Sequence, residues 1–229
     1  MCFSPEVSFS LAGVLVAGGA YCAQKAIRVD RHLVPLAVIP LVFGVQQFCE
    51  GWVWTGIEHS APGVISVAAA VYLFFALCFW PIWIPFSMLL VERSGKTRLY
   101  LRLMLALGVA TGVGLMIPIV VDPTSLAVDV THHSLYYNID DSPVFRLIPN
   151  ALWQAIYFAV VSTPLFVSSL RKMVHFGVAV ILSAAATHVF FDHTFASVWC
   201  FFAAALSLYL CVLFFRIPTR LVIPRPAPL

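Results

Sequence analysis

The chain has 229 residues, 62% of them hydrophobic and only 10% charged, and its formal net charge at pH 7 is +3. Soluble domains carry roughly 25% charged residues, so this composition excludes a water-soluble globular fold. The basic residues form no patch of the kind that binds nucleic acid. The expected partner of this chain is a lipid bilayer.

Apolar runs follow one another along the whole chain, each long enough to cross a hydrocarbon core about 30 Å thick, which takes about 20 helical residues. In lipid each backbone N–H and C=O needs an internal partner, and the runs are continuous rather than alternating, so they predict helices and not barrel strands. We expect an all-α, single-domain bundle of seven transmembrane helices over residues 1–229. The predicted spans are 9–27, 34–57, 63–91, 98–121, 144–168, 172–193 and 195–215.

The charged residues divide between the two sides that these spans define. Twelve of the thirteen lysines and arginines lie at the junctions after the first, third, fifth and seventh spans, and eight of the ten acidic residues lie on the other side. Because lysine and arginine are retained in the cytoplasm during insertion, we expect the N-terminus outside and the C-terminus in the cytoplasm. The longest loop, 122–143, is then external. If this loop folds over the bundle as a lid, it would bring His132 and His133 close to the outer ends of the helices.

The second span carries an ionisable residue, Glu50, about two turns from its outer end. Such a residue is expensive in lipid unless it is paired or hydrated, which makes it a candidate for function. Gln46 and Gln47 precede Glu50 by four and three residues, so all three side chains can share one helix face.

Prolines and glycines shape the next two spans. Pro81 and Pro85 remove helical donors from the third span and predict a kink there. Gly112 and Gly114 in the fourth span allow a neighbouring helix to approach closely.

The fifth and sixth spans add polar residues at a similar depth. Asn150 and Gln154 lie four apart in the fifth span, with Tyr157 beside them. His188 and Asp192 lie four apart at the outer end of the sixth span, where the carboxylate would fix the tautomer of the imidazole for metal binding or proton transfer. Together with Glu50 these residues predict a polar cavity that opens outward, and the alternative is hydrogen bonding that only joins the helices, worth about 0.6–2 kcal/mol per contact.

Three short elements of the sequence stand out: Met1-Cys2-Phe3-Ser4, Gln-x-x-Glu-x-x-x-Trp from Gln47 to Trp54, and Ala-Ser-x-Trp-Cys from Ala196 to Cys200. Together they resemble an uncharacterised family of bacterial multi-pass membrane proteins. The resemblance implies a bacterial plasma (inner) membrane and a heptahelical domain, and no established activity comes with it. Its signature positions are Cys2, Ser4, Gln47, Glu50, Ser197, Trp199 and Cys200.

A looser similarity connects the chain to seven-helix zinc hydrolases that act on lipid amides. His188, Asp192 and His193 would imitate part of the site that such enzymes build from intramembrane histidines, aspartate and serine. This chain lacks their second intramembrane histidine pair, so the similarity is one of fold.

Three functions remain open at this point. In a metal-dependent membrane hydrolase of a lipid or small polar substrate, Glu50, His188 and Asp192 would be catalytic, and zinc would be held by Glu50, His188, His193 and Cys2. In a proton- or cation-coupled transporter of small solutes, Glu50 would be the coupling carboxylate. The third function is a ligand-sensing or partner-binding membrane subunit. The ligand-binding candidates are Gln46, Gln47, Asn150, Gln154, Tyr157 and Trp199.

Overall fold

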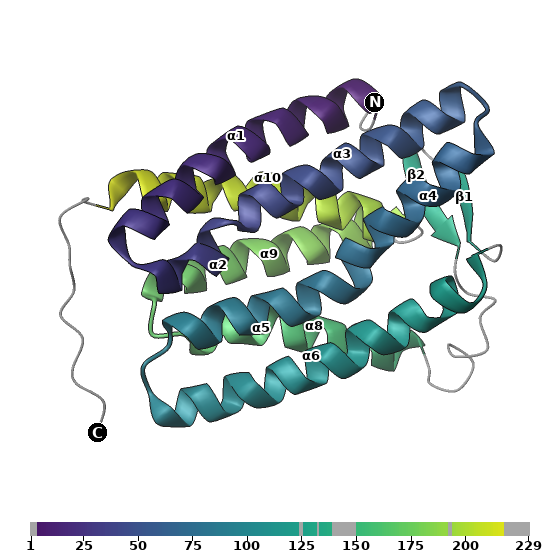
Figure 1. Cartoon of the computed structure of the whole chain (residues 1–229). Helices are drawn as coiled ribbons and strands as arrows, with labels where there is room; N and C mark the ends of the chain where they lie inside the picture. Colours follow the sequence, from purple (N-terminus) through teal and green to yellow (C-terminus); the bar gives the residue numbers. More distant parts are fainter. Residues whose placement is uncertain (1–3, 124–125, 132, 139–149, 192–193, 218–229) are drawn as a thin grey trace.

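A computed structural model of the chain describes residues 4–123, 126–131, 133–138, 150–191 and 194–217. Its helices run side by side along one common direction, and a small hairpin lies at one end of the bundle (Figure 1). The elements are α1 (Pro5–Val29), η1 (Arg31–Leu33), α2 (Val34–Ala37), α3 (Ile39–Glu58), α4 (Pro62–Leu73), η2 (Phe74–Phe79), α5 (Trp80–Val91), α6 (Gly95–Val121), β1 (Ala127–Thr131), β2 (Ser134–Asn138), α8 (Asn150–Val167), α9 (Arg171–Phe190) and α10 (Phe195–Arg216).

Six helices in the described part of the chain are long and apolar enough to cross a membrane. Two of them are composite, because η1, α2 and α3 form one span from Arg31 to Glu58, and α4, η2 and α5 form another from Pro62 to Val91. A shorter apolar helix, Leu152–Val167, lies where the fifth span was predicted. Many side chains on the outer faces are apolar, as expected for surfaces in contact with lipid.

The segment after α6 corrects the expectation of an all-α chain. Strands β1 and β2 pair antiparallel, with Thr131 opposite Ser134, and His133 in the turn adopts a φ of 58°. Leu135 and Tyr137 are two residues apart in β2, so both point to the same side of the strand, and both are buried against the helices. A predicted external loop thus supplies a strand that covers one end of the bundle.

The helix of the third span is irregular directly before its prolines. The six residues of η2 form a π-helical segment that ends directly before Trp80 and Pro81. Proline has no N–H and its ring crowds the preceding turn, and the wider π-helix relieves this crowding. On the neighbouring helix, a Cβ added to Gly108 would lie 2.0 Å from the carbonyl oxygen of Pro81, and one added to Gly112 would lie 2.9 Å from that of Cys78. The close approach predicted at Gly112 is confirmed, whereas Gly114 faces the Trp153 ring.

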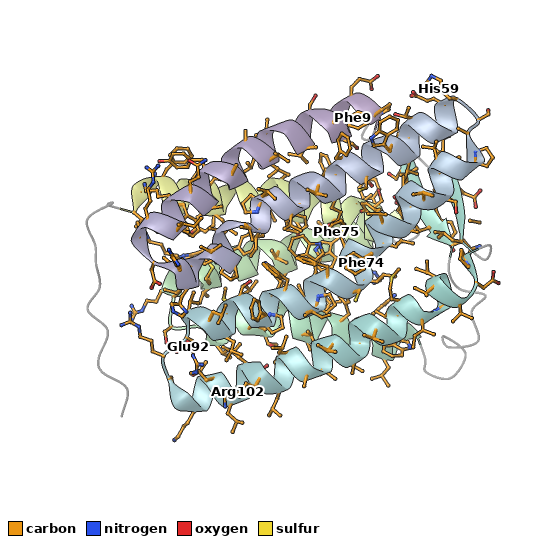
Figure 2. The ribbon with its side chains drawn as sticks, in the orientation of Figure 1. Phe9, His59, Phe74, Phe75, Glu92 and Arg102 are labelled. Atoms are coloured by element: carbon orange, nitrogen blue, oxygen red, sulfur yellow. The ribbon has the colours of Figure 1, made fainter. Side chains whose placement is uncertain are left out.

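The bundle has two ends that can be told apart by the elements they carry. The start of α1 lies at the end that carries β1 and β2, which we call the hairpin end, and α10 finishes at the opposite end (Figure 1). Figure 2 shows His59 at the hairpin end and Glu92 at the opposite end.

Glu92 connects two helix–helix turns at the opposite end. Its Oε1 accepts hydrogen bonds from the backbone N–H groups of Arg93 (2.8 Å) and Ser94 (2.9 Å) and from Ser169 Oγ (2.7 Å), and its Oε2 accepts one from Ser169 N–H (2.8 Å). Burial acts to raise the pKa of the Glu92 carboxyl, but these hydrogen bonds outweigh it and hold the pKa below its ordinary value. One carboxylate thereby ties the α5–α6 turn to the α8–α9 turn.

Candidate functional site

Glu50 lies on the buried face of α3, and its side chain has no exposed surface. Ser197 Oγ on α10 donates a hydrogen bond of 2.5 Å to Oε1 of the carboxylate. The second oxygen, Oε2, has no hydrogen-bond partner among the described residues. No described lysine, arginine or histidine interacts electrostatically with the carboxyl group. The carboxyl group is thus buried with one oxygen satisfied and the other able to accept a further hydrogen bond.

Two glutamines lie one turn further along the same buried face. Gln46 and Gln47 are both fully buried, and Trp80 Nε1 on α5 donates a 2.7 Å hydrogen bond to Gln46 Oε1. The Gln46 amide nitrogen and both polar atoms of the Gln47 side chain have no partner within the described chain. Gln47 lies beside Glu50 without reaching hydrogen-bonding geometry. The unsatisfied amide of Gln47 therefore adjoins a half-satisfied carboxyl group, and the unsatisfied Gln46 nitrogen belongs to the same buried face.

Aromatic rings and a thiol complete the surroundings. Tyr72 on α4 donates a 3.3 Å hydrogen bond to the carbonyl of Ala196, and its ring stacks on that of Tyr137 with centroids 5.0 Å apart. The buried thiol of Cys200 lies beside Tyr72 and Gln46. Burial, with Glu50 nearby, raises the pKa of the Tyr137 hydroxyl well above its usual value, so this hydroxyl stays protonated. We call the following set the Glu50 cluster: Gln46, Gln47, Glu50, Tyr72, Trp80, Tyr137, Ser197 and Cys200.

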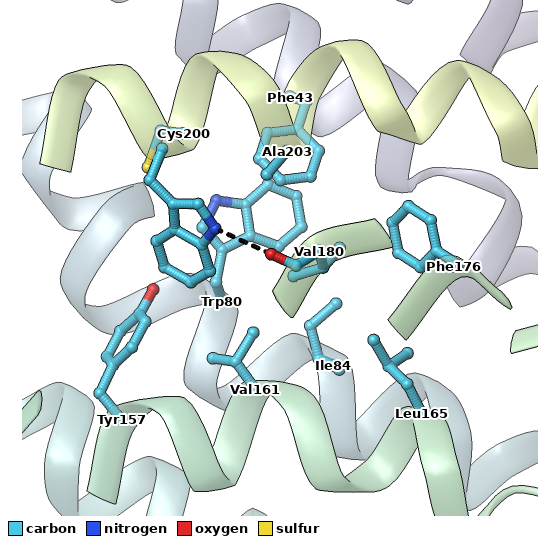
Figure 3. A pocket seen from close by; sticks show the side chains of 11 residues that line it. Phe43, Trp80, Ile84, Tyr157, Val161, Leu165, Phe176, Val180, Cys200 and Ala203 are labelled. Carbon is cyan, nitrogen blue, oxygen red and sulfur yellow. Dashed lines mark hydrogen bonds between the residues drawn. The ribbon is translucent and has the colours of Figure 1, made fainter. Parts of the chain in front are cut away.

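An apolar cavity of about 30 Å³ adjoins the Glu50 cluster (Figure 3). Trp80 and Cys200 belong to the cluster and also line the cavity. A cavity of this size has room for about one water-sized or methyl-sized group. The other lining residues are Phe43, Ile84, Tyr157, Val161, Leu165, Phe176, Val180, Trp199 and Ala203.

Comparison with known proteins assigns the chain to a family. A family model described as "Family of unknown function (DUF6629)" matches residues 1–225. The chain belongs to this family. No curated protein and no solved structure matches the chain. Because the function of the family is unknown, the site of this DUF6629 member must be interpreted from its own residues.

Tyr157 and Trp199 were predicted to bind a ligand in a polar cavity, but the structure places both outside the Glu50 cluster. Both line the apolar cavity, where the Tyr157 hydroxyl donates to the carbonyl of Ala76 (2.6 Å) and Trp199 Nε1 donates to that of Val180 (3.5 Å). Gln154 is exposed on α8. The side chain of Asn150 lies outside the described residues.

The structure does not bring His188 to Glu50. The buried positions of α9 include Val180, Ala184 and Thr187, which follow the helical repeat, and His188 is the next residue along and is exposed. The prediction that His188 faces the bundle interior is therefore wrong. Asp192, the candidate partner of His188, lies outside the described residues.

The zinc site predicted from the sequence gains no support from the residues that the structure describes. No group of three or more His, Cys, Asp and Glu side chains suited to a metal ion occurs among them. Two of the four predicted ligands, Cys2 and His193, lie outside the described residues.

For several residues of the Glu50 cluster, the type of side chain gave no reason to predict that they belong to a site. Ser197 and Cys200 were named only through the family resemblance, and Tyr72, Trp80 and Tyr137 carry no signal in an apolar, aromatic-rich sequence. The useful signal for the first two was their spacing, because Ser197 and Cys200 are three residues apart and share one face of α10. The lid expected from 122–143 is formed by Leu135 and Tyr137, while His133 is exposed and His132 lies outside the described residues.

Proposed function

We propose that this protein is a seven-span membrane protein that binds a small ligand, one that donates hydrogen bonds, at the buried carboxyl group of Glu50. Six long apolar helices support the membrane location, and the apolar helix α8 would be the seventh span. The bacterial plasma membrane implied by the family resemblance is part of the proposal.

The distribution of charge supports an orientation with the N-terminus outside. Lys25, Lys96 and Arg171 lie near helix boundaries at the opposite end, whereas Glu58 and Asp122 lie at helix boundaries of the hairpin end. Positive residues favour the cytoplasmic side, so the hairpin end would face outward. Strand β2 would then cover the Glu50 cluster from the external side.

The observation that carries the proposed binding is the unsatisfied oxygen of Glu50. A polar atom buried in an apolar environment without a partner costs roughly 2–7 kcal/mol, and nearly all such atoms in proteins are paired. A helix-joining role would be met by neutral amides at lower cost in lipid. Glu50 Oε2 with the amides of Gln46 and Gln47 is therefore best explained as the protein half of a binding site.

The chemistry of these atoms favours a cationic donor as the ligand. Of the atoms without a partner among the described residues, Glu50 Oε2 and Gln47 Oε1 are acceptors, while the two donors, Gln46 Nε2 and Gln47 Nε2, belong to side chains that lie beside the Cys200 thiol and the Glu50 carboxyl group. Because no described basic side chain balances the carboxylate, a ligand that brings a positive charge would remove most of the penalty of burying it. A primary ammonium group supplies both the charge and three donors.

Methylammonium tests the proposal directly. We expect methylammonium chloride, compared with potassium chloride at the same concentration, to raise the thermal unfolding midpoint of the purified protein, because a ligand that binds the folded state stabilises it. Glu50→Gln should abolish the increase. Ser207→Ala is the matched control, since Ser207 is a buried hydroxyl of α10 that bonds within its own helix. An equal response in wild type and Glu50→Gln, or none in wild type, would contradict the proposal.

A further inference from the structure

Cys22 and Cys211 are buried cysteines on the first and last helices of the described chain, α1 and α10. Their thiols share a hydrogen bond, so the two sulfur atoms are in contact although they lie far apart in the sequence. The other three cysteines that the structure describes, Cys49, Cys78 and Cys200, have no thiol among the groups that interact with them. Two of the five described cysteines therefore form a pair.

The packing of α1 against α10 holds this pair in register. Tyr21 stacks on Phe215 with ring centroids 4.3 Å apart, and Lys25 Nζ donates a 2.9 Å hydrogen bond to the carbonyl oxygen of Phe215. Phe215 follows Cys211 by one helical turn. Tyr21 and Lys25 lie on either side of Cys22 in the sequence of α1. These contacts fix the two helices relative to each other at the level of the two thiols.

Gly18 allows the two helices to approach closely at this level. It precedes Cys22 by one helical turn, and a Cβ added to it would lie 3.1 Å from the Cys211 sulfur. The Cys211 side chain is therefore packed directly over this turn of α1. A disulfide needs Cα atoms no more than about 7 Å apart, and a glycine beside the pair favours such an approach.

Packing between α1 and α10 does not by itself require sulfur at both positions. Close packing of helices in a membrane needs only small side chains, which alanine and serine also supply. Two thiols in contact add a reaction that alanine and serine lack, because they can be oxidised to a disulfide.

The surroundings of the pair suit a reaction with a small oxidant. Tyr21 and Phe215 are 41% and 57% exposed, so the pair lies close beneath the outer surface of the bundle. Lys25 interacts electrostatically with Cys22, and a positive charge beside a thiol stabilises the thiolate that reacts. The pair lies towards the end of the bundle at which α10 finishes (Figure 1), the end that would face the cytoplasm in the orientation proposed above. Disulfides formed in the cytoplasm are usually transient and redox-sensing.

We infer that Cys22 and Cys211 are a modification site, at which a peroxide forms a reversible disulfide bond between α1 and α10. One thiol, as its thiolate, attacks an oxygen of hydrogen peroxide, the O–O bond breaks, and a sulfenic acid and a water molecule result. The second thiol attacks the sulfur of the sulfenic acid, so the S–S bond forms and a second water molecule leaves. The two sulfur atoms together lose two electrons, which the peroxide gains. This inference uses no residue of the Glu50 cluster.

Treatment of the purified full-length protein with hydrogen peroxide tests the inference. The treated protein is unfolded and alkylated, and the added groups are counted by mass spectrometry. Treated wild type should accept two groups fewer than untreated wild type, and a peptide pair joined through Cys22 and Cys211 should appear after proteolysis. Dithiothreitol should restore both lost groups. The treated protein should also unfold at a higher temperature, because a link between distant residues restricts the unfolded chain.

Serine variants identify the two sulfur atoms. Cys22→Ser and Cys211→Ser should each abolish the linked peptides, the loss of two alkyl groups and the rise in unfolding temperature. Cys78→Ser is the matched control, since Cys78 is a described cysteine without a thiol beside it, and it should respond like wild type. Glu50→Gln should also form the disulfide to the same extent as wild type.

Three results would overturn the inference. The first is treated wild type that accepts as many alkyl groups as untreated wild type. The second is a loss of two groups that persists in Cys22→Ser, since other cysteines would then be responsible. The third is a loss that dithiothreitol does not reverse, which would indicate irreversible oxidation to sulfinic acid. None of these results bears on the methylammonium experiment, so either proposal can fail alone.

Discussion

Two glutamates are buried at opposite ends of the bundle and are held in different ways. Glu92 is 2% exposed, and its two oxygens accept four hydrogen bonds from the turns that it joins. Glu50 is completely buried, yet one oxygen accepts from Ser197 and the other has no partner in the described chain. Burial alone does not separate a structural carboxylate from one that we propose to bind a ligand. The number of donors that the fold supplies does.

Removal of the Glu92 carboxylate should have the largest effect on stability. Glu92→Ala leaves the N–H groups of Arg93, Ser94 and Ser169 without their acceptor, and hydrogen bonds to a charged group contribute about 1.5–3 kcal/mol each without being additive. We expect a loss of about 3–5 kcal/mol in the free energy of unfolding, measured by denaturant titration in mixed micelles. Glu58→Ala, an exposed carboxylate at the hairpin end, should change it by at most about 0.5 kcal/mol. Equal effects of the two variants would disprove the role of Glu92.

Acid should weaken the same contact to a smaller extent. Because the pKa of Glu92 is lower in the folded state than its ordinary value of 4.5, its contribution to stability is complete above about pH 4.5 and is lost as the pH falls through the folded-state pKa. The unfolding midpoints of wild type and Glu92→Gln should therefore differ most at neutral pH and converge as the pH falls from 4.5 through the folded-state pKa. A difference that stays constant over this range would show that the charge of Glu92 does not matter.

The substitution Glu50→Gln should have the smallest effect on stability, and in the opposite direction. Glutamine keeps the shape of the side chain and can still accept a hydrogen bond from Ser197, while burial of an amide is less costly than burial of a charge. We expect the free energy of unfolding to be equal to that of wild type or higher by up to about 2 kcal/mol. A clear loss of stability with unchanged methylammonium binding would assign Glu50 to the structure, like Glu92.

The sequence predicted the part of the site that lies within one helix. Gln46, Gln47 and Glu50 share a buried face of α3 because the spacing of three and four residues is fixed by the helical repeat. The same reasoning could not fix which face of α9 turns inward, so it placed His188 in the interior when the neighbouring Thr187 occupies that position. Which face of a helix points inward depends on the helices packed against that face. The sequence of one helix does not specify this face when apolar residues occur all around the helix.

The hairpin and Glu92 were missed for a related reason. Strand β2 is stabilised by contacts of Leu135 and Tyr137 with helices far away in the sequence, and a polar loop gives little local indication of such contacts. Glu92 lies in a segment of the chain that is rich in lysine and arginine, so its charge gave no reason to expect a buried carboxylate. The partner that buries it, Ser169, lies 77 residues further along the chain.

By itself the sequence determined that the chain is helical and apolar enough for a membrane, because the hydrophobicity of a run and the backbone's need for internal hydrogen bonds are local properties. Only the tertiary structure decided that Ser197 pairs with Glu50, that Trp80 joins a polar cluster to an apolar cavity, and that Tyr137 of β2 stacks on Tyr72. These contacts join residues from α3, α5 and α10, and their partners are chosen by packing between helices, which no single segment encodes.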